Sequence, residues 1–278
     1  MSKAGKIIEP NEYKTLIKDM LADFHKICVD NNIRYFVAYG TLIGTIRHNG
    51  FIPWDDDIDV WMHGEDYDRF VDIVSNSNSK YYILSLENSP YYFNVMARFC
   101  SNEGILKLKG VPDIDNFGPF IDIFPFYKAP ENREERMKFY NEIYAASLDV
   151  KYSLPFRYYK TLSFRSRMSA YLECIKRWKK RYLIGTEKLK KAYKELITKY
   201  EETDSLRYYP VFHRLNVPDR RLFSQSEIEE VELHKFEDIE VFVPKSYHSI
   251  MTRLYGDYMK LPPVEEQVPK HHFIPYWK

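Results

Sequence analysis

Four aspartates lie within five positions at the start of an apolar stretch, and this cluster constrains the fold more than any other feature of the sequence. The segment reads WDDDIDVWM, with the acids at Asp55, Asp56, Asp57 and Asp59. Ionised carboxylates this close repel one another and are costly to bury unless a cation neutralises them. Side chains at i and i+2 of a strand share a face, so Asp57 and Asp59 are predicted to project together from a strand. Such a pair favours a hard divalent cation, Mg²⁺ or Mn²⁺.

A third acid lies in a similar setting. Asp122 stands between two isoleucines in the apolar stretch PFIDIFPF. Taken alone, an isolated carboxylate there is typical of a strand-end cap. Beside an acidic pair it favours a functional carboxylate. We therefore predict Asp57, Asp59 and Asp122 as the metal ligands and the catalytic residues.

A Gly-Thr turn precedes the acidic pair in the chain. Gly40 and Thr41 lie between a predicted strand and a short predicted helix. Backbone N–H groups, a hydroxyl and a helix N-terminus at such a place favour an anion, although a Gly-Thr pair alone is usually only a turn. Arg47, near the end of the same helix, can clamp a phosphate or simply complement the helix C-terminus. The prediction is phosphate binding by Gly40, Thr41 and Arg47.

The apolar periodicity along the chain predicts an α/β (α+β) fold with a mixed sheet. Helices are expected at 12–30, 41–48, 64–76, 132–150, 164–184, 186–202 and 245–256. Strands are expected at 33–40, 57–62, 81–86, 92–100, 104–109 and 120–126, with a hairpin at 236–244. The proline-rich tail 257–278 is expected to be irregular. This pattern divides the chain into a catalytic core, 1–129, and a mainly helical region, 130–278.

Composition indicates an ordinary globular chain in a reducing compartment. Of the 278 residues, 45% are hydrophobic and 29% charged, and no apolar run is long enough to span a bilayer. The first residues lack the apolar core of a signal peptide. The three cysteines, Cys28, Cys100 and Cys174, are not in metal-ligand spacing and are typical of reduced thiols. The expected location is cytoplasmic.

Three short pieces of the chain resemble the signature of the nucleotidyltransferase fold. They are GT at 40–41, DIDV at 57–60 and IDI at 121–123. The longer string YFVAYGTLIGTIRHNGFIPWDDDIDVWM resembles the LicD family, whose bacterial members transfer phosphocholine and whose distant relatives are the fukutin-type enzymes. The segment FEDIEVFVPKSYHSIMTRLYGDYMKLPP, followed by His271-His272, is also similar to the family. Two departures are a Tyr39-Gly40 pair where many members have Gly-Gly, and a weaker match over 150–215.

The resemblance implies a reaction and a donor. The donor would be CDP-choline or a related CDP-alcohol, the acceptor a sugar hydroxyl on a teichoic acid, lipopolysaccharide or capsule precursor, and the leaving group CMP. Phosphoryl transfer needs positioning and charge neutralisation, which Mg²⁺ supplies. Asp57 and Asp59 would hold one or two Mg²⁺, and Asp122 would hold the second and take the sugar proton. Asp55 would support the edge of the site; Asp56 has no assigned role.

Choline adds a requirement, because a quaternary ammonium is bound by aromatic faces. Trp54 and Trp61 flank the acidic strand, and Trp54 is the predicted substrate contact. A single aromatic residue is nevertheless more often part of a core than of a cage.

The charge of the chain is uneven. The segment 151–194 carries 14 lysines and arginines against two acids, although the whole chain has a net charge of +1. Such a segment is either a solvated helix face or a surface for an anionic partner. No nucleic-acid motif accompanies it, so no nucleic acid is expected. If the acceptor is lipid-linked, a cationic helix bearing Trp178, Tyr182, Leu183 and Ile184 can contact the inner face of the plasma membrane.

Three rival functions were weighed against this prediction. An EF-hand starting at Asp55 would need glycine at its sixth position and commonly glutamate at its twelfth, where this chain has Val60 and Asp66. A glycosyltransferase with an Asp-x-Asp pair is disfavoured by the Gly-Thr turn and by Asp122. A small-molecule nucleotidyltransferase of the same fold stays open and differs in its donor, ATP.

Overall fold

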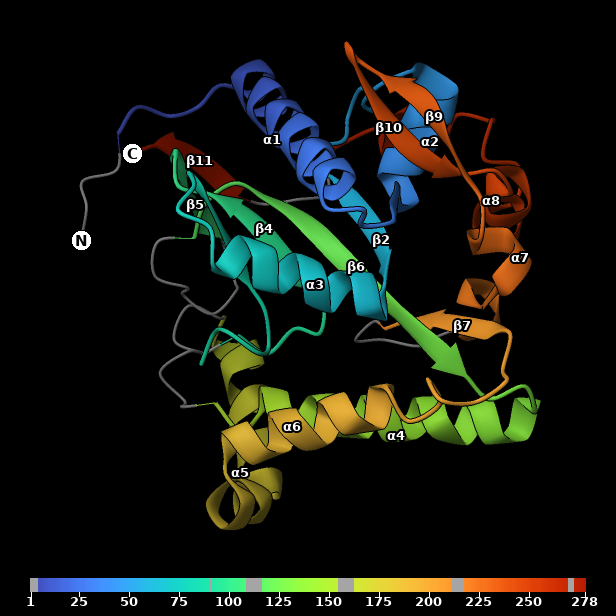
Figure 1. Cartoon of the computed structure of the whole chain (residues 1–278). Helices are drawn as coiled ribbons and strands as arrows, with labels where there is room; N and C mark the ends of the chain where they lie inside the picture. Colours follow the sequence, from blue (N-terminus) through green and yellow to red (C-terminus); the bar gives the residue numbers. More distant parts are fainter. Residues whose placement is uncertain (1–4, 91, 109–116, 155–162, 212–217, 270–272) are drawn as a thin grey trace.

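The computed structural model describes residues 5–90, 92–108, 117–154, 163–211, 218–269 and 273–278. Its centre is a seven-stranded mixed sheet (Figure 1). The strands are β1 (Tyr35–Val37), β2 (Asp59–His63), β3 (Tyr81–Leu84), β4 (Ala97–Ser101), β6 (Phe120–Ala129), β7 (Arg207–Pro210) and β8 (Phe223–Ser224). The order is β1-β2-β6-β4-β3, with β7 pairing β6 and β8 pairing β7. β2 and β6 are parallel, and the other pairs are antiparallel. The predicted mixed α/β fold is confirmed.

One face of the sheet packs against two helices, α1 (Pro10–Asp30) and α3 (Gly64–Ser75) (Figure 1). A capping box at Glu9 and a proline at the first helical position begin α1, as expected from helix-start chemistry. Phe24 of α1 and Phe70 of α3 meet Phe99 of β4 at ring-centroid distances of 5.8 and 5.7 Å. All three side chains are buried, so this face is the main core.

The other helices and strands surround this centre. They are α2 (Tyr39–His48), α4 (Arg133–Lys151), α5 (Phe164–Ile184), α6 (Thr186–Ile197), α7 (Gln225–Ile228), α8 (Tyr247–Tyr255), and the short 3₁₀ helices η2 (Pro218–Arg221) and η3 (Val264–Glu266). Helices α4 and α6 enclose a second hydrophobic cluster below the sheet, joined to it through Tyr127 of β6. The proposed division at residue 129 stays a prediction, and β7 hydrogen-bonds to β6 across it.

Two small sheets complete the fold. The predicted hairpin is present as β9 (Val231–Phe236) and β10 (Ile239–Pro244). β5 (Gly104–Leu108) pairs with β11 (Phe273–Trp277). The prediction of an irregular tail is therefore wrong for its last residues, because β5 supplies a partner from far away in the chain. Among the described helices, none has the length and apolar character needed to cross a bilayer.

Candidate active site

The second face of the sheet carries the functional side chains. Asp59 of β2 and Asp122 of β6 are directly opposite each other in the parallel register, so their side chains lie on the same face. The next residues on that face, Trp61 and Phe124, are buried. Neighbouring strands therefore bring together two carboxylates that are far apart in the sequence, as predicted.

The three preceding aspartates form a compact loop cluster. Carboxylate oxygens of Asp55, Asp56 and Asp57 lie within 4.8 Å of one another, and all three residues are half-buried. Asp57 belongs to this loop rather than to a strand, because β2 finds its partners only from Asp59 onward. The prediction that Asp57 lies in a strand is wrong. Asp57 is nevertheless close to Asp59, because its charge raises the pKa of the Asp59 carboxyl.

Asp59 reports the electrostatics of the whole cluster. Burial raises the pKa of its carboxyl well above the ordinary value, and the charges of Asp57, Asp122 and Asp55 raise it further, whereas Arg98 lowers it. A group of oxygen-only donors that destabilise one another's charge is the chemistry a hard divalent cation relieves. The residues present therefore fit the predicted metal. The identity of the metal and the number of ions stay predictions.

Arg98 is a residue of the candidate site that sequence analysis missed. Its Nε donates to Asp122 Oδ1 at 2.7 Å, and both side chains are 13% exposed. The rings of Phe120 and Phe117 cover the guanidinium, with centroids 4.2 and 5.1 Å from Cζ. The ion pair holds Asp122 in one orientation and leaves its second oxygen to other partners. The signal in the sequence was a lone arginine in the predicted strand 92–100.

Gly40 and Thr41 lie in the first turn of helix α2, not before the helix as predicted, and they join α2 to the carboxylates. The Thr41 hydroxyl is buried and accepts a hydrogen bond from the Asp59 backbone N–H at 2.9 Å. A Cβ at Gly40 would lie 2.5 Å from Asp55 Oδ2, so a side chain there would displace that carboxylate. Tyr39 stands in place of the first glycine of the Gly-Gly pair expected from the family resemblance. Its φ is 43°, a strained value for an aromatic residue. The turn is thus packed directly against the acid loop.

Two other predicted residues lie at the edge of the site. Arg47 donates to the carbonyl of Tyr258 at 2.7 Å and so ties α2 to the segment after α8. Its predicted role as a phosphate clamp stays a prediction. Trp54 is half-buried, and its ring centroid lies 6.4 Å from that of His48.

Residues from distant segments complete the surroundings of the acids. Lys14 of α1 donates to the carbonyls of Ile52 and Pro53 and so anchors the acid loop. Tyr13 is buried, and the charges of Asp56 and Asp57 add to the effect of burial in raising its pKa.

The C-terminal half also reaches this site. Tyr255 of α8 keeps 46% of its surface exposed, while its hydroxyl is packed closely enough for burial to raise its pKa. Tyr39, Asp59 and Asp55 raise that pKa further, which places the Tyr255 hydroxyl in the field of the acids. Arg221 lies over the Tyr39 ring at 5.8 Å. These positions offer an exposed aromatic ring and a cation beside the carboxylates.

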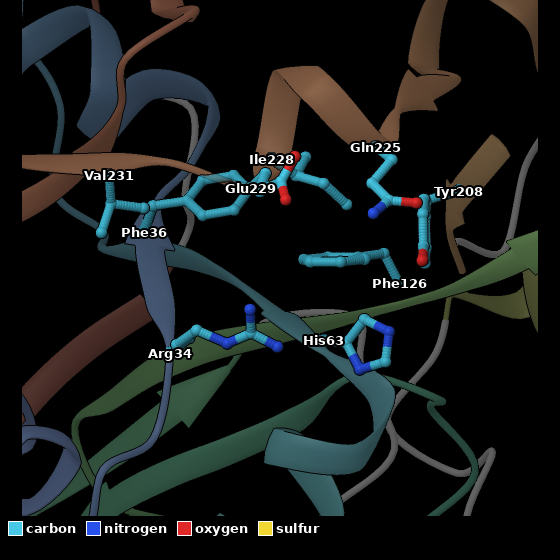
Figure 2. A pocket seen from close by; sticks show the side chains of 9 residues that line it. All are labelled: Arg34, Phe36, His63, Phe126, Tyr208, Gln225, Ile228, Glu229 and Val231. Carbon is cyan, nitrogen blue, oxygen red and sulfur yellow. The ribbon is translucent and has the colours of Figure 1, made fainter. Parts of the chain in front are cut away.

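A cavity of about 170 Å³ lies on the same sheet face, at the other end of β2. Its lining residues are Arg34, Phe36, His63, Phe126, Tyr208, Gln225, Ile228, Glu229 and Val231 (Figure 2). His63 Nδ1 accepts from the Glu65 N–H, and burial lowers the pKa of the ring, so it is neutral at pH 7. His63 follows Asp59 by four residues, about 13 Å along a strand, with Trp61 buried between them. The cavity is therefore separate from the carboxylates.

Comparison with known proteins assigns the family. Residues 32–169 match the family model described as LicD/FKTN/FKRP, nucleotidyltransferase domain. The chain is 31% identical over 272 residues to the lipopolysaccharide cholinephosphotransferase LicD of Haemophilus influenzae, covering 94% of this chain and 95% of that protein. The chain belongs to the LicD family. An uncharacterized protein of Rickettsia prowazekii matches a shorter part, 33% identical over 81 residues and 29% of each chain.

Membership in the LicD family confirms the predicted resemblance and makes the protein a transferase of phosphate-containing groups. The LicD family model includes the turn at Gly40, the acid loop and Asp122, whereas Arg221 and Tyr255 lie beyond it. The His271-His272 pair of the predicted family pattern falls outside the described residues.

Proposed function

We propose that this protein transfers phosphocholine from CDP-choline to a sugar hydroxyl of a cell-surface glycan precursor in a Mg²⁺-dependent reaction that releases CMP. The observation that carries the proposal is the nearly full-length similarity to a lipopolysaccharide cholinephosphotransferase. The paired Asp59 and Asp122 beside the acid loop support it, because phosphoryl transfer requires concentrated positive charge at the phosphates and such a cluster recruits it. Teichoic acid, lipopolysaccharide and capsule precursors are the acceptor classes.

The side chains would share the work as follows. Asp57, Asp59 and Asp122 would hold Mg²⁺, which when bound neutralises phosphate charge. Asp122, oriented by Arg98, would accept the proton of the sugar hydroxyl through its free carboxylate oxygen. The sugar oxygen then forms a bond to the choline-bearing phosphorus as the bond from that phosphorus to CMP breaks. Gly40 lets the backbone of the turn approach the donor phosphates.

The first experiment measures CMP release from CDP-choline with Mg²⁺ and a crude acceptor glycan. Release is expected to depend on both metal and acceptor, and Asp59→Ala is expected to lower it at least about 100-fold because ligand carboxylates are lost. Asp72→Ala, an exposed acid of α3, is the matched control and should retain full activity. Consumption of CDP-ribitol, CDP-glycerol or CDP-ethanolamine instead would correct the donor alone. Reaction only with ATP or a UDP-sugar would refute the phosphocholine proposal.

Choline recognition by Tyr255 can be tested with the same assay. A quaternary ammonium is attracted to an aromatic face, and Tyr255 offers an exposed ring beside the acids. Tyr255→Leu should raise KM for CDP-choline about tenfold, whereas Tyr255→Phe should leave it nearly unchanged. An equal effect of both variants would show that the hydroxyl, and not the ring, is used.

A further inference from the structure

Helix α5 turns its apolar side chains away from the protein. Six large apolar residues recur at positions i, i+4, i+7, i+11, i+14 and i+18, which is one face of an α-helix. This apolar stripe consists of Phe164, Met168, Tyr171, Ile175, Trp178 and Tyr182. Their exposed fractions run from 46% for Met168 to 80% for Tyr182. A surface helix normally buries such a stripe, so α5 is oriented the opposite way from an ordinary one.

The opposite face of α5 is the one that packs on the protein. Ala170 is buried, and Glu173, Cys174 and Arg177 are half-buried, at the spacing i, i+3, i+4 and i+7. Arg177 Nε lies 3.1 Å from a carboxylate oxygen of Asp149 on α4. The centres of the two faces are about 130° apart at 100° per residue, so contacts on the packed face turn the stripe outward. In Figure 1, α5 projects beyond α4 and α6, away from the sheet.

Cations border the apolar stripe. Arg165, Lys179 and Arg181 are exposed and flank the stripe, whereas the exposed Lys176 and Lys180 pair with Glu173 and Asp149. Glu173, the single acid of the helix, lies on the packed face. An apolar face with basic borders and with Trp and Tyr among its members is the composition of a helix that lies in a membrane interface. Anionic headgroups complement these charges within a Debye length of the surface.

We propose that α5 docks this protein on an anionic membrane surface, with the apolar stripe in the interface and the basic residues on the headgroups. The helix would lie parallel to the bilayer, because its apolar stripe runs from Phe164 to Tyr182, nearly its whole length. The sequence predicted membrane contact by the whole basic segment 151–194, of which 155–162 lies outside the described residues. The proposal assigns this contact to one face of α5. The inference rests on the helix alone and not on the proposed phosphocholine transfer.

The test is co-sedimentation with vesicles of phosphatidylcholine containing about 30% phosphatidylglycerol, an anionic composition suited to polybasic surfaces. The full chain should bind these vesicles and leave pure phosphatidylcholine vesicles largely free. A stripe variant, Met168→Ser/Ile175→Ser/Tyr182→Ser, should bind at least about tenfold more weakly, because three apolar groups no longer enter the interface. The matched control, Leu206→Ser/Val264→Ser, removes equally exposed apolar side chains elsewhere and should bind as the wild type does.

The contribution of charge is measured separately. Replacing Arg165, Lys179 and Arg181 by Gln should weaken binding about 100-fold at low salt, with a smaller difference at high salt. Thermal melts of all variants should match the wild type, since every changed side chain is exposed. Absence of binding at low salt would overturn the proposal, as would equal binding by the stripe variant. A concentration-dependent dimer that the stripe variant abolishes, without vesicle binding, would assign the stripe to a second copy.

Discussion

Asp59 is a predicted metal ligand whose charge lowers the stability of the folded protein. Asp59 is half-buried, and desolvation of its carboxyl together with the charges of Asp57, Asp122 and Asp55 raises its pKa. A raised pKa in the folded state means that ionisation of Asp59 opposes folding at neutral pH. Binding of the proposed cation would recover the free energy that this repulsion removes from folding, so the affinity for the cation and the instability of the empty site would have the same source.

Removal of this charge should stabilise the metal-free protein. Asp59→Asn keeps the shape of the side chain, so with EDTA at pH 7 its Tm should exceed that of the wild type. Because folding raises the pKa of Asp59, its carboxyl contributes to stability below the pKa of the unfolded state, about 3.9. This contribution is lost as pH rises through the pKa of the folded state. The Tm difference should therefore vanish near pH 4 and grow toward pH 7. A pH-independent difference would show that packing, and not charge, is responsible.

Arg98 and Asp122 form the opposite case, a nearly buried pair whose charges compensate each other. Arg98→Met should lower the free energy of unfolding by about 3 kcal/mol, because Asp122 is left as an uncompensated charge in the interior. Urea unfolding measures this loss. The double variant Arg98→Met/Asp122→Leu should recover most of it. If the double variant is as unstable as the single one, the loss comes from packing against Phe117 and Phe120.

At the scale of elements, helix α2 sets the position of the acid loop through two glycines. A Cβ at Gly44 would lie 2.4 Å from the backbone oxygen of Gly50, whereas a Cβ at Gly40 would meet the side chain of Asp55. A backbone atom gives way less easily than a rotatable carboxylate. Gly44 therefore affects mainly the stability of the acid loop, whereas Gly40 affects mainly the position of the Asp55 carboxylate.

Alanine at each glycine should accordingly have a different effect. Gly44→Ala should destabilise the protein by about 2 kcal/mol, since overpacking moves α2 off the segment that leads to Asp55. Gly40→Ala should cost less stability but should reduce transferase activity, because it displaces the Asp55 carboxylate. Thermal melts and CMP release measured on both variants test this. Loss of stability alone at Gly40 would place Asp55 outside the reaction.

The elements were largely predictable from the sequence, and their pairing was not. Alternation around Asp57 predicted a strand that starts two residues early. The pattern carries no information about where β1 and β6 begin to pair with β2. Asp122 was predicted from its apolar setting taken together with the acidic pair. Arg98 was missed because its meaning depends on the register that sets β4 against β6. Local pattern thus identified the acids, and only tertiary alignment identified the cation that pairs with Asp122.

At the scale of the whole molecule, the two ends of the described chain are joined. Gly5 N donates to the Trp277 carbonyl at 2.8 Å, and Trp277 N donates to the Lys6 carbonyl at 2.9 Å. The Trp277 side chain packs against the main core. The strand β11 therefore connects the start of the chain, β5 and the core.

Trp277→Ala should destabilise the whole fold by about 2 kcal/mol, less than a fully buried tryptophan because this ring is half-buried. Ile274→Ala, on the same strand but 39% exposed, is the control and should change stability little. Chemical unfolding followed by far-UV circular dichroism measures both. Equal, small effects would mean that β11 is held by its backbone hydrogen bonds alone.

The pairing of β5 with β11 also affects how the chain is made. The ribosome synthesises Gly104–Leu108 long before Phe273–Trp277, and at usual rates the interval is on the order of ten to thirty seconds. During that time β5 lacks the strand that covers its edge in the finished molecule, and such edges recruit other chains. The nascent protein is thus most prone to aggregate between the emergence of these two strands, and a chaperone that covers β5 would act in that interval.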